Sequence, residues 1–357
     1  MWRSRFWSRT APWRATGGVV VGTICLVSAP LVAQSPTPAM PDSVRSYVRE
    51  AMAIFRANSV HQSEVNWRAL EDSVVSRSAG AQASDGTWMA LTWALRRVDP
   101  HSFLMPPLNK MAELTGGMAP PSRAQSVGVA SRGAGQLLDG RLGLVVVPPH
   151  AGRNRPAYVD SLHAQFGALD HAGICGWIVD LRDDSGGNMW PMLAGVGPLL
   201  GAEVVGSFTN SRPGVAWRYR DGRSWSGDST PPAEFEGWGT SPAPTLAHAD
   251  APVALLIGRK TASSGEMTVL AFLGRPNVRS FGDSTAGYTS ANTSVPLRDG
   301  ATLVVTSSYP RDRLGRAYPL RIVPDELVAA SDSAEGDGPV RQAVTWLRRL
   351  PTCAEHR

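Results

Sequence analysis

The sequence predicts an α/β fold preceded by a helical segment, and two patterns support this prediction. Residues 42–57, 64–77 and 85–97 carry apolar side chains at the spacing of amphipathic helices. From about residue 125, short β-branched runs alternate with helical stretches, which is the pattern of an α/β core. The chain has 357 residues, of which 43% are hydrophobic and 18% are charged, so it can bury a full core.

The predicted core elements follow one another regularly along the chain. Residues 207–250 are rich in Gly, Pro, Ser and Trp and show little periodicity, and we interpret them as a long insertion near the functional site. The chain then divides into a helical cap (42–106), a core (120–335) and a C-terminal helix and tail (336–357). The expected core strands are 142–147, 177–181, 253–257, 278–281 and 302–306, and the expected helices are 156–170, 189–200, 264–274 and 339–350.

The first 33 residues have the pattern of a secretory signal peptide. Four arginines precede an apolar stretch at residues 17–32, and the pattern predicts cleavage after Ala33. A retained membrane anchor is the alternative, but this stretch is shorter than the roughly 20 residues that span a bilayer. We therefore expect removal of residues 1–33, a linker at 34–41, no membrane span afterwards, and export to a periplasm or secretion.

Charge and cysteine content exclude several other classes of protein. The same four arginines supply four of the five formal positive charges, so the rest of the chain is nearly neutral and lacks the basic patch that nucleic acid requires. Cys175 and Cys353 remain after the signal segment, which leaves one disulfide possible. No metal-ligand motif and no glycine-rich phosphate or dinucleotide loop is present, so we expect neither a metal nor a cofactor.

A turn of small residues carries the candidate nucleophile. Residues 261–266 read TASSGE and join the 253–257 strand to the helix that follows. A serine at a helix N-terminus lies near unpaired backbone N–H groups that stabilise developing negative charge, which a nucleophilic Ser263 requires. The alternative is that Ser263 or Ser264 only caps the helix.

Three other polar segments are candidates for the same site. A Gly-Gly turn at 186–187 follows a buried strand, and its N–H groups could form part of an oxyanion hole or simply make a tight turn. Residues 281–292 form a polar loop after the next strand. The sequence Asp-Pro-His-Ser at 99–102 ends the helical cap and places His101 on a loop, where its unperturbed pKa near 6.5 suits proton transfer.

Taken together and in this order, the motifs resemble those of the tail-specific (C-terminal processing) serine proteases. The resemblance covers most of residues 40–330 and implies a crotonase/Clp-like ββα core with an N-terminal helical cap. The family's nucleophile motif is similar to the 261–266 turn. This similarity implies Ser263 as nucleophile, the N–H of Ser264 as an oxyanion donor, and Glu266 as a supporting residue.

The resemblance extends to the Gly-Gly turn and to a strand ending downstream. The family's Asp-Leu-Arg-x-Asn-x-Gly-Gly turn is similar to residues 180–187, which implies Gly186, or alternatively Gly187, as the second oxyanion donor. The family's Val-x-Pro-Asp ending is similar to the segment that finishes at Asp325, a residue expected to be structural.

The general base is where this sequence departs from many family members. They pair the serine with a lysine, but the corresponding stretch here, residues 287–289, contains none. The sequence is therefore more similar to the tricorn-core-like branch, which implies His101 as the base. Tyr288 is expected to position substrate or close the pocket, because a phenol with a pKa near 10 is a poor base. The acid partner stays unassigned, with Asn292 and Asp99 as candidates for orienting a neighbour.

These features predict an exported serine peptidase that hydrolyses peptide bonds through an acyl-enzyme on Ser263, with peptides or proteins as substrates. A catalytically silent member of the same fold that binds a peptide or an apolar ligand is the alternative. An α/β-hydrolase esterase is a weaker alternative, because no GxSxG motif is present. Only about 75 residues separate His101 from Trp177, so no PDZ module is expected.

Overall fold

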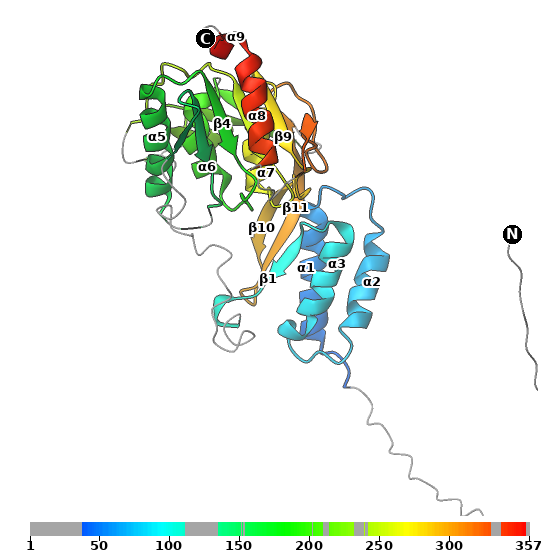
Figure 1. Ribbon diagram of the computed structural model, residues 1–357. Coiled ribbons are helices and arrows are strands. Elements are labelled where there is room, and N and C mark those ends of the chain that lie inside the picture. Colours follow the sequence, from blue (N-terminus) through cyan, green and yellow to red (C-terminus); the bar gives the residue numbers. More distant parts are fainter. Residues whose placement is uncertain are drawn as a thin grey trace, which may run out of the picture. The chain divides into compact units, whose positions relative to one another are not determined.

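In a computed structural model of the chain, the described residues form two β-sheets of six strands each (Figure 1). The predicted signal peptide and residues 34–37 of the predicted linker lie outside the described residues. No helix among the described residues is both long enough and apolar enough to cross a membrane. The structure describes residues 38–110, 135–150, 152, 154–201, 203–209, 214–231, 239, 242–329 and 337–354.

The first sheet has the strand order β12-β9-β8-β4-β3-β2. All neighbouring strands run parallel except β2, which pairs antiparallel with β3. The central strands β4 and β8 are buried, as near-continuous hydrophobic runs in a parallel sheet are expected to be. The bounds are β2 (Gln136–Leu138), β3 (Leu142–Val146), β4 (Gly176–Asp180), β8 (Val253–Ile257), β9 (Val278–Gly282) and β12 (Glu326–Leu327).

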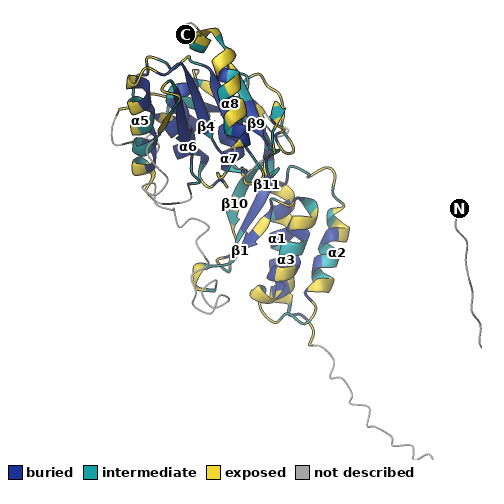
Figure 2. Ribbon diagram, in the orientation of Figure 1, coloured by how far each residue is buried: buried dark blue, intermediate teal, exposed yellow. Residues whose placement is uncertain are grey.

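Helices cover both faces of this sheet (Figures 1 and 2). Alternate residues of β4 belong to different hydrophobic clusters, because successive strand side chains point to opposite faces. Trp177 and Val179 pack with α5, α6 and α7, whereas Ile178 packs with α8. The bounds are α5 (Arg155–His171), α6 (Met189–Val196), η3 (Gly197–Leu199), α7 (Ser264–Phe272), α8 (Gly338–Arg349) and α9 (Pro351–Ala354).

A disulfide joins Cys175, just before β4, to Cys353 in α9, with a Cα–Cα distance of 5.2 Å and a sequence separation of 178 residues. The bond closes a long loop, so it removes conformational freedom from the unfolded chain. We expect Cys353→Ser to lower the free energy of unfolding by about 2–5 kcal/mol, as measured by chemical denaturation. A reducing agent should lower the stability of the wild type but leave that of the variant unchanged.

The second sheet is antiparallel and has the order β1-β11-β5-β6-β7, with β10 also paired to β11. Most of the elements that the sequence did not predict are strands of this sheet. The bounds are β1 (Phe103–Met105), β5 (Val204–Thr209), β6 (Val215–Arg220), β7 (Arg223–Ser226), β10 (Ala291–Pro296) and β11 (Thr302–Asp312).

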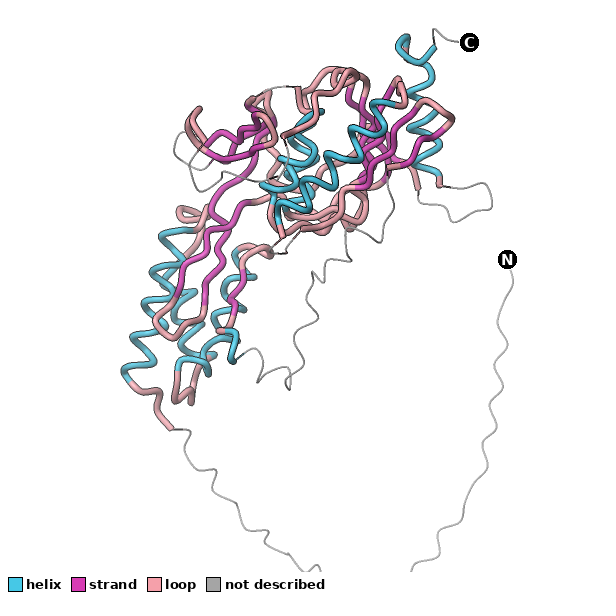
Figure 3. Tube along the Cα trace, turned by 90° about the vertical axis from the view of Figure 1, so that its left-hand side faces the viewer, coloured by secondary structure: helices cyan, strands magenta, loops and turns pink. Residues whose placement is uncertain are grey.

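The N-terminal helices pack on one end of this sheet, and Figure 3 shows its long strands running beside them. Leu303 and Val305 of β11 share a buried cluster with Phe55, Val74 and Leu95 of the helices. The prediction of an α/β protein with an N-terminal helical cap is therefore confirmed. The helices are α1 (Asp42–Asn58), α2 (Trp67–Arg77), η1 (Ser84–Thr87) and α3 (Trp88–Val98).

The interpretation of residues 207–250 as a stretch without regular structure is wrong for its first half. Strands β6 and β7, with the end of β5, occupy that half, and Trp217 and Trp225 are fully buried. The reason is visible in the burial of β6, where only one residue of six is buried. Such a strand lacks the apolar alternation by which strands are recognised.

Candidate active site

The candidate nucleophile Ser263 lies between β8 and the first residue of α7. It is half-buried, and its backbone has φ +52° and ψ −118°. A residue other than glycine with positive φ is strained, and such strain is concentrated at functional sites. The turn after a central parallel strand therefore holds a serine in a conformation that a purely structural cap does not need.

This backbone geometry leads to a stability prediction. We expect Ser263→Gly to be more stable than Ser263→Ala by about 1 kcal/mol, because glycine adopts positive φ without steric cost. Both variants lack the hydroxyl, so their difference reports the backbone, and thermal unfolding measures it. An unstrained position would instead make Ser263→Ala the more stable variant by about 0.4–1 kcal/mol, because glycine loses more conformational freedom on folding.

The carboxylate of Glu266 ties the nucleophile turn to the loop that follows β9. Its Oε2 atom accepts hydrogen bonds from the N–H groups of Ser263 and Tyr288, each at 2.8 Å. Its Oε1 atom accepts from Gly287 N–H at 2.9 Å and from the Thr285 hydroxyl. Burial raises the pKa of Glu266, and these four hydrogen bonds offset the rise only in part. All four partners donate, so the site suits the ionised form and gives Glu266 a supporting role.

The Gly-Gly turn after β4 packs directly against the nucleophile turn. Gly186 has φ +94° and Gly187 has φ +128°. A Cβ atom added to Gly186 would lie 2.7 Å from the carbonyl oxygen of Ala262 and 3.0 Å from Ser264 N. Only glycine therefore allows this approach. The Ser264 hydroxyl also donates to the Gly187 carbonyl at 2.8 Å, which joins the two turns.

The two glycines differ in whether their N–H groups are available. Gly186 is buried, and its N–H donates to Asp184 Oδ1 at 2.9 Å. Gly187 is exposed, and its N–H has no hydrogen-bond partner within the described part of the chain. Ser264 begins α7, so its N–H has no partner within the helix. The structure thus favours Gly187 over Gly186 as the donor that would accompany Ser264.

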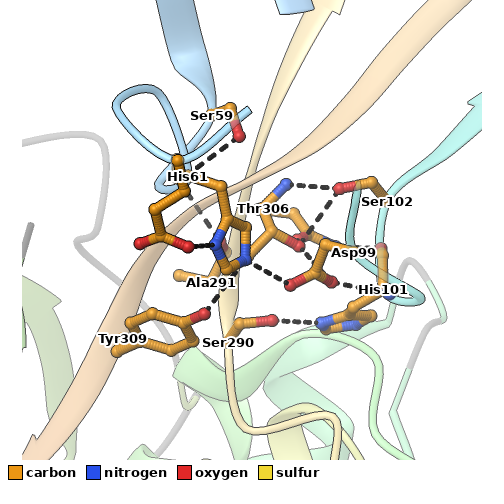
Figure 4. Close-up of polar contacts among 12 residues, drawn as sticks. Ser59, His61, Asp99, His101, Ser102, Ser290, Ala291, Thr306 and Tyr309 are labelled. Atoms are coloured by element: carbon orange, nitrogen blue, oxygen red, sulfur yellow. Dashed lines mark hydrogen bonds and ion pairs between the residues drawn. The ribbon is translucent and has the colours of Figure 1, made fainter. Parts of the chain in front are cut away.

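His101 lies on the loop between α3 and β1, and three contacts hold it (Figure 4). Its N–H donates to Asp99 Oδ1 at 2.8 Å, and its carbonyl accepts from Asn292 Nδ2 at 3.1 Å. Its ring Nδ1 lies 2.8 Å from Ser290 Oγ. The His101 and Tyr288 ring centroids are 5.2 Å apart. Because Nδ1 is engaged, Nε2 is the ring nitrogen left for proton transfer.

The electrostatic surroundings favour neutral imidazole at His101. Burial lowers its pKa below the ordinary value of 6.5, and the nearby Asp99 charge and the hydrogen bond with Ser290 oppose this only in part. A neutral imidazole is the form that accepts a proton from a serine hydroxyl.

Asp99 supports the backbone of His101 rather than its ring. Its Oδ1 also accepts from Thr306 Oγ1 at 2.9 Å, and its Oδ2 lies 3.4 Å from His61 Nε2. Tyr309 OH lies 3.2 Å from the same His61 nitrogen (Figure 4). The ring partner is the Ser290 hydroxyl, which the sequence analysis missed. Its only signal was its place in the polar 281–292 loop, where several hydroxyl groups compete.

Five of the candidate residues meet at one cavity of about 590 Å³, whereas Gly186, Glu266 and Tyr288 do not line it. Ser263, Ser264, Gly187, His101 and Asn292 all line it, together with Ser290. Its apolar wall includes Met189, Trp190, Phe208, Val215 and Met267. Strands β5 and β6 therefore contribute to the cavity, which agrees with the expected place of the 207–250 segment near the site. The described residues include no group of three or more His, Cys, Asp or Glu that could hold a metal ion.

Comparison with known proteins decides the family. The family described as peptidase family S41 matches residues 142–328, which is more than half of the chain and includes both turns. The chain belongs to peptidase family S41. The resemblance to the C-terminal processing proteases is thereby confirmed, since a protease of that kind is also among the similar structures.

Three known proteins show how far this S41 family member matches other sequences and folds. The nisin-resistance protein of Lactococcus lactis subsp. lactis is 34% identical over 184 residues, which are 51% of this chain and 54% of that protein. The chain thus matches about half the length of this relative. A lipoprotein from Streptococcus agalactiae has a TM-score of 0.60 at 24% identity, covering 86% of this chain and 97% of the other. The photosystem II D1 C-terminal processing protease has a TM-score of 0.54 at 16% identity, covering 81% and 94%.

Proposed function

We propose that this S41 family member is an exported serine peptidase that cleaves peptide bonds through an acyl-enzyme on Ser263. The supporting observation is that Ser263 and His101, which are 162 positions apart in the printed numbering, line one cavity. Ser264 and Gly187 line the same cavity. Their N–H groups have no main-chain partners among the described residues.

The proposed reaction has two stages. The Ser263 hydroxyl attacks the substrate carbonyl while His101 Nε2 takes its proton, and the oxyanion accepts hydrogen bonds from Ser264 N–H and Gly187 N–H. His101 then protonates the leaving amine, and water releases the acyl group by the same steps in reverse order. Ser290 holds the imidazole of His101, Asn292 holds its main-chain carbonyl, and Glu266 holds the nucleophile turn.

Three observations support export. The first 33 residues have the signal-peptide pattern, and the Cys175–Cys353 disulfide fits an oxidising compartment. The names of two relatives, a lipoprotein and a nisin-resistance protein, also fit a role at the cell envelope. Nisin is therefore one substrate to test.

A fluorophosphonate probe tests the proposed nucleophile directly. We expect the mature wild type to be labelled at Ser263, as identified by mass spectrometry of the modified peptide, and Ser263→Ala to be unlabelled. Ser264→Ala is the matched control, because it keeps the backbone N–H and should still be labelled. Failure of the wild type to react between about pH 5 and about pH 9 would contradict the proposal.

One observation favours a second candidate, a catalytically silent member that binds a peptide. The ring of His101 is paired with a hydroxyl group rather than a carboxylate, so the imidazolium formed during catalysis would lack a charged partner. Peptide binding that is equal in the wild type and in Ser263→Ala, without turnover or labelling, would support this candidate.

A further inference from the structure

Asp184, between β4 and the Gly-Gly turn, is a buried carboxyl that the mechanism above does not use. Its exposed fraction is 0%. Its Oδ1 accepts the Gly186 N–H at 2.9 Å, but its Oδ2 is buried and has no hydrogen-bond partner within the described part of the chain. An ionised carboxylate with one oxygen unsatisfied in the interior is costly, whereas the neutral acid is much less so.

The carboxyl of Asp184 lies against both turns that build the site. A Cβ atom added to Gly265 in α7 would lie 2.9 Å from Asp184 Cγ and 3.1 Å from its Oδ1. The Asp184 main-chain carbonyl accepts the Ala262 N–H at 2.9 Å, one residue before the nucleophile. Asp184 therefore occupies the buried side of the Gly186 and Gly187 turn.

The charged groups on the Asp184 turn itself do not offset a negative charge there. Asp180 and Asp183 are acids, and the cations near them are already paired. Arg182 bonds Asp180 and Asp337, and Lys260 bonds Asp183 at 3.0 Å.

Within the described part of the chain, burial and the Gly186 hydrogen bond set the pKa of Asp184, and no cation of a neighbouring element shifts it. Arg155, at the start of α5, is exposed. Tyr158 of α5 has its pKa raised by burial and then by the charge of Asp184. His150, whose main chain pairs with the Gly-Gly turn, has its pKa lowered by burial and by Arg155, so its ring is neutral. Glu266 of α7 is itself an acid.

We propose that Asp184 is a positioning residue that works as a neutral carboxylic acid, and that its ionisation at alkaline pH weakens acylation of Ser263. In the neutral form it holds Gly186 N–H, while Gly187, which lines the cavity, keeps its N–H without a partner in the described part of the chain. In the ionised form it puts a negative charge behind the oxyanion donors, where the low dielectric makes repulsion strong. This inference rests on the proposed function, because it assigns a role within that reaction.

The pH range follows from the burial of this group. Burial raises the pKa of Asp184 from 3.8 to about 8, and the Gly186 hydrogen bond lowers it only in part. The stability contributed by the retained proton is complete below pH 3.8 and is lost as the pH rises through about 8. Acylation should decline above about pH 8 for the same reason.

The first test is the pH dependence of the rate of fluorophosphonate labelling from about pH 6 to about pH 10. We expect the wild-type rate to fall to a lower level as the pH rises through about 8, and we expect Asp184→Asn to show no such fall. Asp183→Asn is the matched control, because Asp183 is exposed and paired with Lys260, and it should show the wild-type fall. The same alkaline fall in Asp184→Asn, or none in the wild type, would overturn the proposal.

A second measurement does not depend on catalysis. Between about pH 4 and about pH 8 the thermal unfolding midpoint of the wild type should fall relative to that of Asp184→Asn, while Asp183→Asn should follow the wild type. A constant difference across this range would overturn the neutral state of Asp184. Absence of wild-type labelling at every pH would instead contradict the proposed function, and the stability comparison would still decide the protonation of Asp184.

Discussion

Replacement of Ser263 with alanine should reduce kcat for peptide hydrolysis by about 10³-fold to about 10⁶-fold while leaving the fold intact. The hydroxyl is the proposed nucleophile, and no other side chain on the turn can take its place. Ser264 Oγ is already committed to the Gly187 carbonyl. One of the four contacts of the Glu266 carboxylate uses the main-chain N–H of residue 263, and the other three come from residues 285, 287 and 288. None uses the side chain of residue 263, so alanine preserves all four.

Peptide hydrolysis followed by chromatography measures this effect, and circular dichroism confirms that the variant is folded. The Ser264→Ala protein provides the comparison, because it loses a hydroxyl at the neighbouring position and keeps the proposed donor N–H. Hydrolysis by Ser263→Ala at the wild-type rate would show that another residue is the nucleophile.

Replacement of His101 with alanine should reduce kcat/KM by about 10²-fold to about 10⁴-fold, the usual contribution of a general base. On the acid side, wild-type kcat/KM should stay constant down to neutral pH and fall below pH 6.5, because burial lowers the pKa of His101 and protonated imidazole cannot accept the serine proton. This acid limb should disappear from the residual activity of the variant.

His171→Ala serves as the histidine control, because His171 is exposed in the last turn of α5 and does not line the cavity. It should retain both the wild-type rate and the acid limb. An acid limb that persists in His101→Ala would assign that ionisation to another group.

Much of the first sheet could be predicted from the sequence because its central strands are buried on both faces. The expected 253–257 strand is β8, and the expected 264–274 helix is α7 with its last two residues removed. A continuous apolar run predicts a buried strand, and the small-residue turn after it predicts where that strand ends. The position of Ser263 between them therefore required no knowledge of distant residues.

The second sheet and the details of the site could not be predicted in this way. Strands β5 to β7 mix exposed and buried residues irregularly, so their pairing depends on partners far along the chain. The choice between Gly186 and Gly187 depends on which N–H the Asp184 carboxyl engages. The ring partner of His101 lies 189 positions away at Ser290, and short-range spacing carries no information about it.

Strand β11 connects the region of the proposed base, His101, with the wall of the cavity. Its first residues pair with β1 directly after His101, and its last residues pair with β5, which carries Phe208 into the cavity wall. Thr306, midway along it, bonds Asp99. A fragment that begins after β1 would therefore keep the nucleophile and lose His101, so neither piece alone could turn over substrate. Two separately produced pieces, 34–106 and 107–357, would offer a complementation assay in which activity reports reassembly of this strand with the cap.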